Sequence, residues 1–144
     1  MRYMIIVKAS ADSEAGVMPE APLLAAMAGY HEELARAGVL LDANGLQPSA
    51  SGWRIRYRGG ERSVTDGPFA ESKEMIAGYT LIQVGSPEEA LEWSRRFPNP
   101  AGEGRDAEIE VRRVFELEDF TPGAEIERSR ALDGRAEALD GRAA

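Results

Sequence analysis

Six segments of the chain show the short apolar runs, or the alternation of apolar and polar residues, that are typical of β-strands. These segments are residues 3–8, 39–42, 52–58, 61–66, 77–84 and 108–117. The runs at 3–8 and 77–84 are apolar on both faces, which predicts central strands that are covered on both sides. In the last segment, apolar side chains at 109, 111, 115 and 117 share one face, and mostly charged side chains share the other. This pattern predicts a strand with one buried face and one polar face.

Two of these segments, 52–58 and 61–66, are joined by Gly59-Gly60, a two-residue signal for a tight turn. We therefore expect them to form a β-hairpin. In its first strand Trp53, Ile55 and Tyr57 alternate with arginines at 54, 56 and 58. Such a basic row is typical of a solvated strand that resists pairing with other chains.

Two further segments have the helical spacing of apolar residues. In residues 20–37 the apolar stripe consists of Leu23, Met27, Tyr30 and Leu34, and Gly38 follows as a stop signal. The second helix begins at Ser86-Pro87, with Glu89 placed to complete a capping box. Its apolar stripe consists of Ala90, Trp93 and Phe97. Residues 9–19 are polar and small, and we expect a loop there.

The predicted elements follow the order β-α-β, an inserted hairpin, then β-α-β. Without the hairpin this is the split βαβ arrangement of a ferredoxin-like fold, in the α+β class. Both helices then cover one face of the sheet. The other face mixes Thr, Tyr, Glu and Arg with apolar residues and would be bare in a single chain. Because pairing two such faces would bury them, we predict a homodimer.

The pattern fades at the C-terminal end, so we expect one domain at residues 1–120 and a tail at residues 121–144. In the tail, the sequence of residues 132–136 recurs at 139–143. Two copies are too few for a repeat fold. Gly134 and Gly141 each weaken a helix by about 1 kcal/mol relative to Ala. The tail is therefore expected to be flexible or a frayed helix.

Composition narrows the classes of function. The chain has no cysteine, one histidine and a formal net charge of −8. Disulfides and cysteine-based sites are excluded, and one histidine cannot build a metal centre. An acidic chain repels a nucleic-acid backbone. No apolar run reaches the ~20 residues of a membrane helix, and the first run is too short for an export signal. We therefore expect a cytoplasmic protein without nucleic-acid, membrane or metal partners.

Five side chains are candidates for polar chemistry, and each also has a structural interpretation. Asp66 is either a base or hydrogen-bond acceptor at a cavity rim, or the residue that closes an Asx-turn. His31 is either a proton carrier or a half-exposed residue on a helix flank. Glu110 and Arg112 either hold a polar ligand or form an ion pair within or between chains. Tyr79 is either a cavity wall or part of the core.

The segment Asp66-Gly67-Pro68-Phe69-Ala70-Glu71-Ser72-Lys73-Glu74 resembles the signature of the YCII-related family, in its DGPF branch. Residues 32–41, 45–48, 77–79, 108–112 and 115–120 fit the same family in order and spacing. The resemblance implies a dimeric α/β barrel, in which two ferredoxin-like sheets face each other around a cavity. On this basis Pro68 and Phe69 of the signature are added as candidate ligand contacts, and no cofactor is expected.

The chain departs from a related branch of the family, whose enzyme-like members carry a His-Asp pair. Alignment of the helix ends places that pair at Met27 and near Phe97, and neither residue matches. His31 lies one turn after Met27, so it is not a direct replacement. The departure argues against chemistry that depends on this pair.

Three functions follow as hypotheses. The first is the binding of a small organic molecule in the dimer cavity, without catalysis. The second is a cofactor-free lyase, isomerase or hydrolase acting on a small cyclic or aromatic metabolite, with Asp66 or His31 moving protons and Arg112 holding the anion. The third is an accessory protein, associated with an extracytoplasmic-function sigma factor, that contacts a transcription regulator through its acidic surface or its tail. The sequence hint is the seven-residue repeat of the tail, and some members of the family that the chain resembles occur near genes for such factors.

Overall fold

The computed structural model describes residues 1–70 and 74–142. Glu71, Ser72 and Lys73, in the middle of the signature segment, therefore lie outside the described residues. The chain divides into two compact units, residues 1–113 and 114–144. The first unit holds two sheets and helices α1 to α3, and the second holds helix α4.

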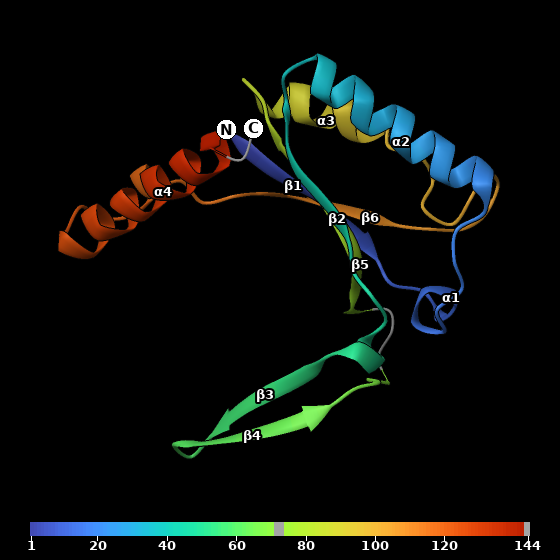
Figure 1. Cartoon of the computed structure of the whole chain (residues 1–144), viewed down its shortest axis with the longest axis horizontal. Helices are drawn as coiled ribbons and strands as arrows, with labels where there is room; N and C mark the ends of the chain where they lie inside the picture. Colours follow the sequence, from blue (N-terminus) through green and yellow to red (C-terminus); the bar gives the residue numbers. More distant parts are fainter. Residues whose placement is uncertain (71–73, 143–144) are drawn as a thin grey trace. The chain divides into compact units, whose positions relative to one another are not determined.

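The first unit is built on a four-stranded antiparallel sheet (Figure 1). Its strands are β1 (Arg2–Lys8), β2 (Leu40–Gly45), β5 (Ile76–Gln83) and β6 (Ile109–Arg113), in the spatial order β2-β5-β1-β6. The first strand thus lies inside the sheet, paired with β5 on one side and β6 on the other. This arrangement confirms the α+β class and is consistent with a ferredoxin-like fold.

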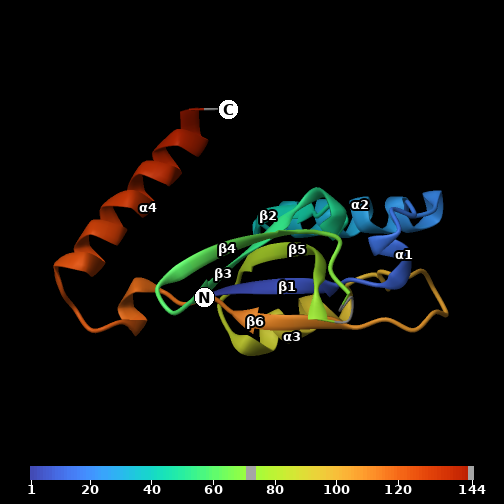
Figure 2. The same ribbon diagram turned by 90° about the horizontal axis from the view of Figure 1, so that it is seen from below.

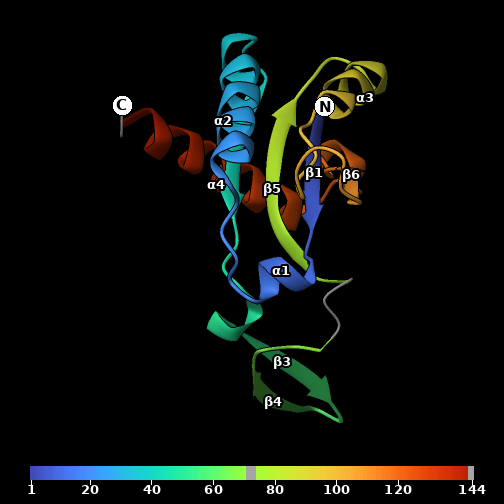
Figure 3. The same ribbon diagram turned by 90° about the vertical axis from the view of Figure 1, so that its right-hand side faces the viewer.

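Helices α2 (Ala21–Arg36) and α3 (Pro87–Arg95) lie on the same face of this sheet (Figure 3). Helix α2 is followed by Gly38 at φ 74°, a backbone conformation that favours glycine. The Ser86 side chain caps α3 by accepting a hydrogen bond from the Glu89 N–H at 3.1 Å. The predicted capping box differs in its second half, because the Glu89 carboxylate accepts a hydrogen bond from the N–H of Gly85 rather than from that of Ser86.

The core lies between these two helices and the sheet. Its buried members are Ile5, Tyr30, Leu34, Val39, Ile82, Val84, Ala90, Trp93 and Phe97. The Tyr30 hydroxyl donates a hydrogen bond to the backbone carbonyl of Trp93 at 2.8 Å, which joins α2 to α3. Burial raises the pKa of Tyr30 to about 12, so its phenol stays neutral. Both helices therefore turn most of their predicted apolar stripes toward the sheet.

The two central strands bury one face against the helices. Ile5 and Ile82 point toward the helices and are fully buried. Their neighbours Met4, Ile6 and Leu81 point the other way, as strand alternation requires, and are only half-buried. We predicted that these strands are covered on both sides. Helices α2 and α3 cover one side and leave the second face open.

Strands β3 (Trp53–Arg58) and β4 (Glu61–Asp66) form a separate two-stranded sheet, which confirms the predicted hairpin. Gly59 and Gly60 make the turn at φ 56° and 79°, where glycine is favoured. A 3₁₀ turn, η1 (Ser49–Ser51), leads into β3. Because the hairpin connects the end of β2 to the start of β5, it projects from that end of the main sheet (Figure 1).

The last strand is shorter than predicted. It ends at Arg113, which pairs with Tyr3 of β1, rather than at residue 117. The apolar residues Phe115 and Leu117 therefore do not belong to the strand, although their spacing continues its alternation. The alternation of apolar and polar residues therefore continues beyond the end of the strand.

Residues 9–19, predicted as a loop, contain one helical turn, α1 (Ala11–Glu14). Two serines cap this turn reciprocally. The Ser10 side chain accepts a hydrogen bond from the Ser13 N–H at 3.1 Å, and the Ser13 side chain accepts one from the Ser10 N–H at 2.8 Å. The sequence thus contains a capping signal for this helical turn, although the polar composition of the segment predicts a loop.

The second unit contains a 3₁₀ turn, η3 (Leu117–Asp119), and helix α4 (Ala124–Arg142), which Figure 2 shows as one continuous helix. Arg130 forms an ion pair with Glu118 at 3.2 Å. A hydrogen bond from its own backbone N–H, helped by Arg130, lowers the pKa of Glu118. Among the helices that the structure describes, none is long and apolar enough to cross a membrane.

Replacing Leu34 by Ala is expected to destabilise the first unit by about 2–5 kcal/mol, because the side chain is fully buried and its removal leaves a cavity. Leu24→Ala in the same helix is the matched control, because Leu24 is 52% exposed, and its effect should stay within about 0.5 kcal/mol. Urea unfolding followed by circular dichroism measures both values. Equal losses in the two variants would contradict the placement of the core.

Candidate functional site

The face of the main sheet that points away from α2 and α3, which we call the open face, collects most of the polar side chains of the strands. Residues paired across antiparallel strands share a face, so the register assigns its members. They are Arg2, Met4, Ile6, Lys8, Asp42, Asn44, Tyr79, Leu81, Gln83, Glu110 and Arg112. Glu110, Arg112 and Tyr79 were predicted as site residues, whereas Lys8, Asp42 and Asn44 were not.

A polar cluster occupies the β2–β5 side of the open face. The Tyr79 hydroxyl donates a hydrogen bond to Asp42 Oδ2 at 2.8 Å. The same hydroxyl accepts a hydrogen bond from Asn44 Nδ2 at 3.0 Å, and Asn44 Nδ2 also lies 3.1 Å from Asp42 Oδ1. The carboxylate and the amide thus fix the orientation of the Tyr79 phenol.

A β-bulge places this cluster on the open face. Leu40 pairs with Ile82 and packs on the core, and the register then shifts so that Asp42 pairs with Leu81 and Asn44 with Tyr79. Strict alternation from Leu40 would have turned residues 42 and 44 toward the helices. The sequence carried no signal for the bulge except the presence of polar residues at two alternate positions of a strand.

A charged cluster occupies the β1–β6 side of the same face. The Glu110 carboxylate lies 3.8 Å from Lys8 Nζ and 3.5 Å from an Arg112 guanidinium nitrogen. Two cations therefore share one anion, which leaves one positive charge in excess. Both ion pairs are partly exposed, so each contributes little to stability by itself.

An apolar strip separates the polar cluster from the charged cluster. Ile6 pairs with Tyr79 on one side and with Glu110 on the other, and Met4 lies between Leu81 and Arg112 in the same way. The open face thus offers a phenol, a carboxylate and an amide at one end, two cations and a carboxylate at the other, and aliphatic side chains between. This arrangement fits a flat organic molecule with an anionic or hydrogen-bonding group at each end.

The signature segment occupies a different place, at the base of the hairpin. Asp66 is exposed and pairs with Trp53 at the end of β4. The N–H of Gly67 donates to the carbonyl of Gly52 at 3.0 Å. The segment therefore begins by closing the two strands of the hairpin.

The remaining signature contacts join the hairpin base to α1. The Phe69 N–H donates a hydrogen bond to Ser49 Oγ at 3.0 Å. The hydroxyl of Ser49 in turn donates to the Glu14 carboxylate, and its backbone N–H donates to the same carboxylate at 3.0 Å. The Arg54 guanidinium lies 3.9 Å above the Phe69 ring. Phe69 thus sits in a network that holds three segments together.

A small cavity of about 260 Å³ adjoins this network. Its lining includes Glu14, Ser49, Arg54, Phe69, Met75 and Ile76. Of the predicted site residues, only Phe69 lines it. The signature segment and the open face therefore carry two separate groups of candidate residues.

His31 lies on the helix-covered side of the sheet. Its Nε2 is 2.9 Å from the Thr80 hydroxyl oxygen, and Thr80 is buried between β5 and α2. Tyr79 is the next residue along β5 and faces the open side, so the sheet separates it from His31. A small molecule on the open face cannot reach His31. The partial burial of the ring agrees with its interpretation as a helix-flank residue.

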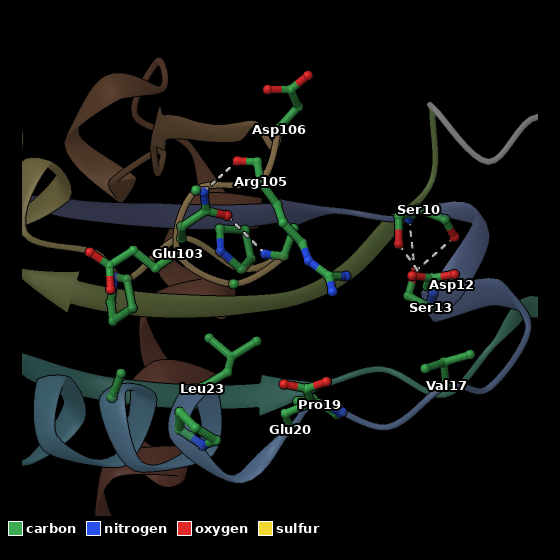
Figure 4. A pocket seen from close by; sticks show the side chains of 18 of the residues that line it. Ser10, Asp12, Ser13, Val17, Pro19, Glu20, Leu23, Glu103, Arg105 and Asp106 are labelled. Atoms are coloured by element: carbon green, nitrogen blue, oxygen red, sulfur yellow. Dashed lines mark hydrogen bonds between the residues drawn. The ribbon is translucent and has the colours of Figure 1, made fainter.

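A larger hollow, of about 890 Å³, lies beside the start of α2 (Figure 4). It is formed by residues between 10 and 26 and by the loop 98–106. Asn99 shapes the loop, because its side-chain amide donates to the Arg105 carbonyl at 2.7 Å and its side-chain oxygen accepts from the Ala101 N–H at 2.9 Å. Acidic residues outnumber the single cation, Arg105, in its lining. Among the described residues, no group of three potential ligands could hold a metal ion here or elsewhere.

Comparisons with known proteins identify a family for the part of the chain that contains the strands. The family model of the YCII-related domain matches residues 1–118. The "Uncharacterized protein R00369" of Rhizobium meliloti (strain 1021) is 36% identical over 73 residues, which are 51% of this chain and 59% of that protein. The match thus spans less than two thirds of the relative's length. Its name states no activity.

Replacing Gly67 by Ala is expected to loosen the hairpin base, because a Cβ at this position would overlap the backbone carbonyl of Ser49. Overpacking of this kind costs about 1–3 kcal/mol. Hydrogen exchange of the Phe69 amide, measured by NMR, should become faster. Gly52→Ala is the matched control, because its Cβ would lie 3.7 Å from the same carbonyl oxygen. Unchanged exchange in Gly67→Ala would disprove the close approach.

The stability of the fold is expected to decrease as the pH falls below about 6.5, because burial lowers the pKa of His31 from its ordinary value of 6.5. The unfolded chain then takes up a proton at a higher pH than the folded chain. The free energy of unfolding is therefore at its full value above 6.5 and declines as the pH falls toward the lowered pKa. His31→Gln, which has no histidine left to titrate, should lack this part of the decline.

Urea unfolding of both proteins at a series of pH values measures the difference. Subtracting the variant from the wild type cancels the carboxylates that titrate at lower pH. Parallel pH profiles would show that the pKa of His31 does not change on folding.

Proposed function

The chain belongs to the YCII-related domain family, and from that premise we propose that it acts as a homodimer that binds a small organic molecule between two open faces. The observation that carries the proposal is the composition of the open face. Hydrogen-bonded polar groups stand at one end, cations stand at the other, and an aliphatic strip joins them. Surfaces that are apolar with a few fixed polar groups are typical of ligand sites.

Pairing of two open faces would give this surface the cover that α2 and α3 provide on the other side. Met4, Ile6 and Leu81 are half-buried in one chain and would become buried in the pair. Face-to-face sheets lie about 10 Å apart, which brings the two sets of polar groups within reach of one small molecule. A symmetric dimer would present each cluster twice, at opposite ends of the space between the sheets.

The chemistry of the clusters indicates the class of ligand. Arg112 presents a planar guanidinium, which is suited to a carboxylate or phenolate. The Tyr79 hydroxyl donates to Asp42 and accepts from Asn44, so its remaining lone pair can accept a hydrogen bond from a hydroxyl on the ligand. A flat ring would lie on Ile6 and Leu81. Hydroxylated aromatic acids and small keto acids combine these features.

Binding is favoured over catalysis because neither of the two proposed proton carriers belongs to the open face. His31 is held against Thr80 across the sheet, and Asp66 belongs to the hairpin. Pro68 and Phe69 remain candidate contacts for a separate ligand site next to Arg54. Catalysis on the open face would need Tyr79 or Asp42 in that role.

Thermal unfolding against a panel of hydroxylated aromatics, quinones, lactones and small keto acids tests the proposal. A ligand at about 100 times its dissociation constant stabilises a fold by roughly 2.7 kcal/mol. We expect at least one acidic aromatic or keto acid to raise the Tm of the wild type. Arg112→Gln and Tyr79→Phe should reduce this shift, because each removes one ligand contact from the open face.

Arg113→Gln is the matched control, because Arg113 is the next residue on β6 and points to the other side of the sheet. It should keep the full shift. A shift that Arg113→Gln loses and Arg112→Gln keeps would refute the site. A wild type that responds to no compound, and that sediments as a monomer, would refute the proposal as a whole.

A further inference from the structure

The β3–β4 hairpin exposes an unusual amount of apolar surface. Trp53, Ile55, Tyr57 and Val64 are 64%, 46%, 67% and 66% exposed. The register places all four on one face, with Ile55 and Val64 directly opposite each other. The described part of the chain therefore leaves about half or more of each of these four side chains exposed.

The hairpin also differs from the rest of the chain in charge. Residues 53–66 hold four arginines and two acidic residues, so the hairpin carries a formal charge of +2 in a chain of net charge −8. The remaining residues carry −10 by difference. A second copy of this chain is therefore electrostatically complementary to the hairpin, whereas a basic partner or another hairpin is not.

The low stability expected of an isolated hairpin also favours its association with a second chain. A lone two-stranded hairpin is marginally stable in water, and exposed apolar residues on it favour association. Protein interfaces are enriched in Trp, Tyr and Arg, and six of the fourteen residues 53–66 are of these types. Arg62 lies 5.0 Å from the Tyr57 ring on the apolar face, which leaves a cation at the margin of that face.

We propose that the hairpin is an arm whose apolar face, formed by Trp53, Ile55, Tyr57 and Val64, packs on a second copy of the chain. The inference rests on the homodimer proposed above and adds a second contact region to it. The hairpin leaves the main sheet at the end where β2 stops and β5 starts, and Figures 1 and 2 show it on the side of the sheet opposite to α2 and α3. A partner seated on the open face would lie within reach of this arm.

Packing of the arm on a second copy should shield Trp53 from solvent, which can be measured on the wild-type protein. Trp53 is 64% exposed in the single chain, whereas Trp93, the second tryptophan, is buried in the core. Dilution through the dissociation constant of the dimer should therefore increase acrylamide quenching and shift tryptophan emission to longer wavelength. Trp53→Phe should abolish this concentration dependence.

A pair of variants tests the contact directly. Ile55→Thr with Val64→Thr removes the apolar pair at the centre of the face but keeps residues that favour strands. Analytical ultracentrifugation should show a dimer weakened by at least about tenfold, which corresponds to 1.4 kcal/mol. The matched control is Arg56→Lys with Ser63→Thr, an opposed pair on the other face of the hairpin, which keeps the charge and should leave the constant unchanged.

The outcomes separate this inference from the proposed function. A dimer that Ile55→Thr with Val64→Thr weakens, with Trp53 shielded on assembly, supports the arm. A dimer that still binds ligand, but has the same constant in both double variants and the same Trp53 quenching at all concentrations, overturns the arm and leaves the proposed function standing. A chain that stays monomeric at every concentration overturns both.

Discussion

Two helices bury their apolar stripes on one face of a four-stranded sheet, and this one-sided packing is the constraint from which the other features follow. Alternation along β1 and β5 sends Ile5 and Ile82 into that core and sends Met4, Ile6 and Leu81 to the opposite side. At those positions the second face of the sheet is also apolar, but it is only half-buried. A single chain cannot satisfy both faces with two helices, and this imbalance is the physical reason for expecting a second copy.

The same alternation places the candidate site residues of the strands on two opposite faces of the sheet. Tyr79 and Thr80 are neighbours on β5, yet one joins the polar cluster of the open face and the other binds His31 beneath α2. Because a sheet is one residue thick, adjacent positions on a strand cannot serve one small site. Residues that looked like partners on the basis of residue type, such as His31 and Arg112, are thereby separated.

The signature segment has a structural role that goes beyond the turn expected at Asp66. Gly67 approaches Ser49 too closely for any side chain, and the Phe69 N–H binds the hydroxyl of the same serine. The Glu14 carboxylate extends the network to α1. These contacts join the base of the hairpin to α1. The segment is therefore needed to position the hairpin arm, whether or not Asp66 binds a ligand.

The sequence by itself determined the elements whose signals are local. The helix stripes, the turn at Gly59-Gly60 and the alternation of β3 all depend on residues within a few positions of one another, and each was predicted correctly. Of the candidate site, Glu110 and Arg112 could be assigned to one face of their strand from period alone, whereas Tyr79 joins that face through the pairing of β5 and β6 with β1. Only the tertiary structure decided the rest, because it depends on which residues pair across strands. The bulge after Leu40 turned Asp42 and Asn44 onto the open face, the pairing of β6 with β1 ended at Arg113, and the packing of α2 on β5 joined His31 to Thr80. Register and packing are non-local, so no window along the chain contains them.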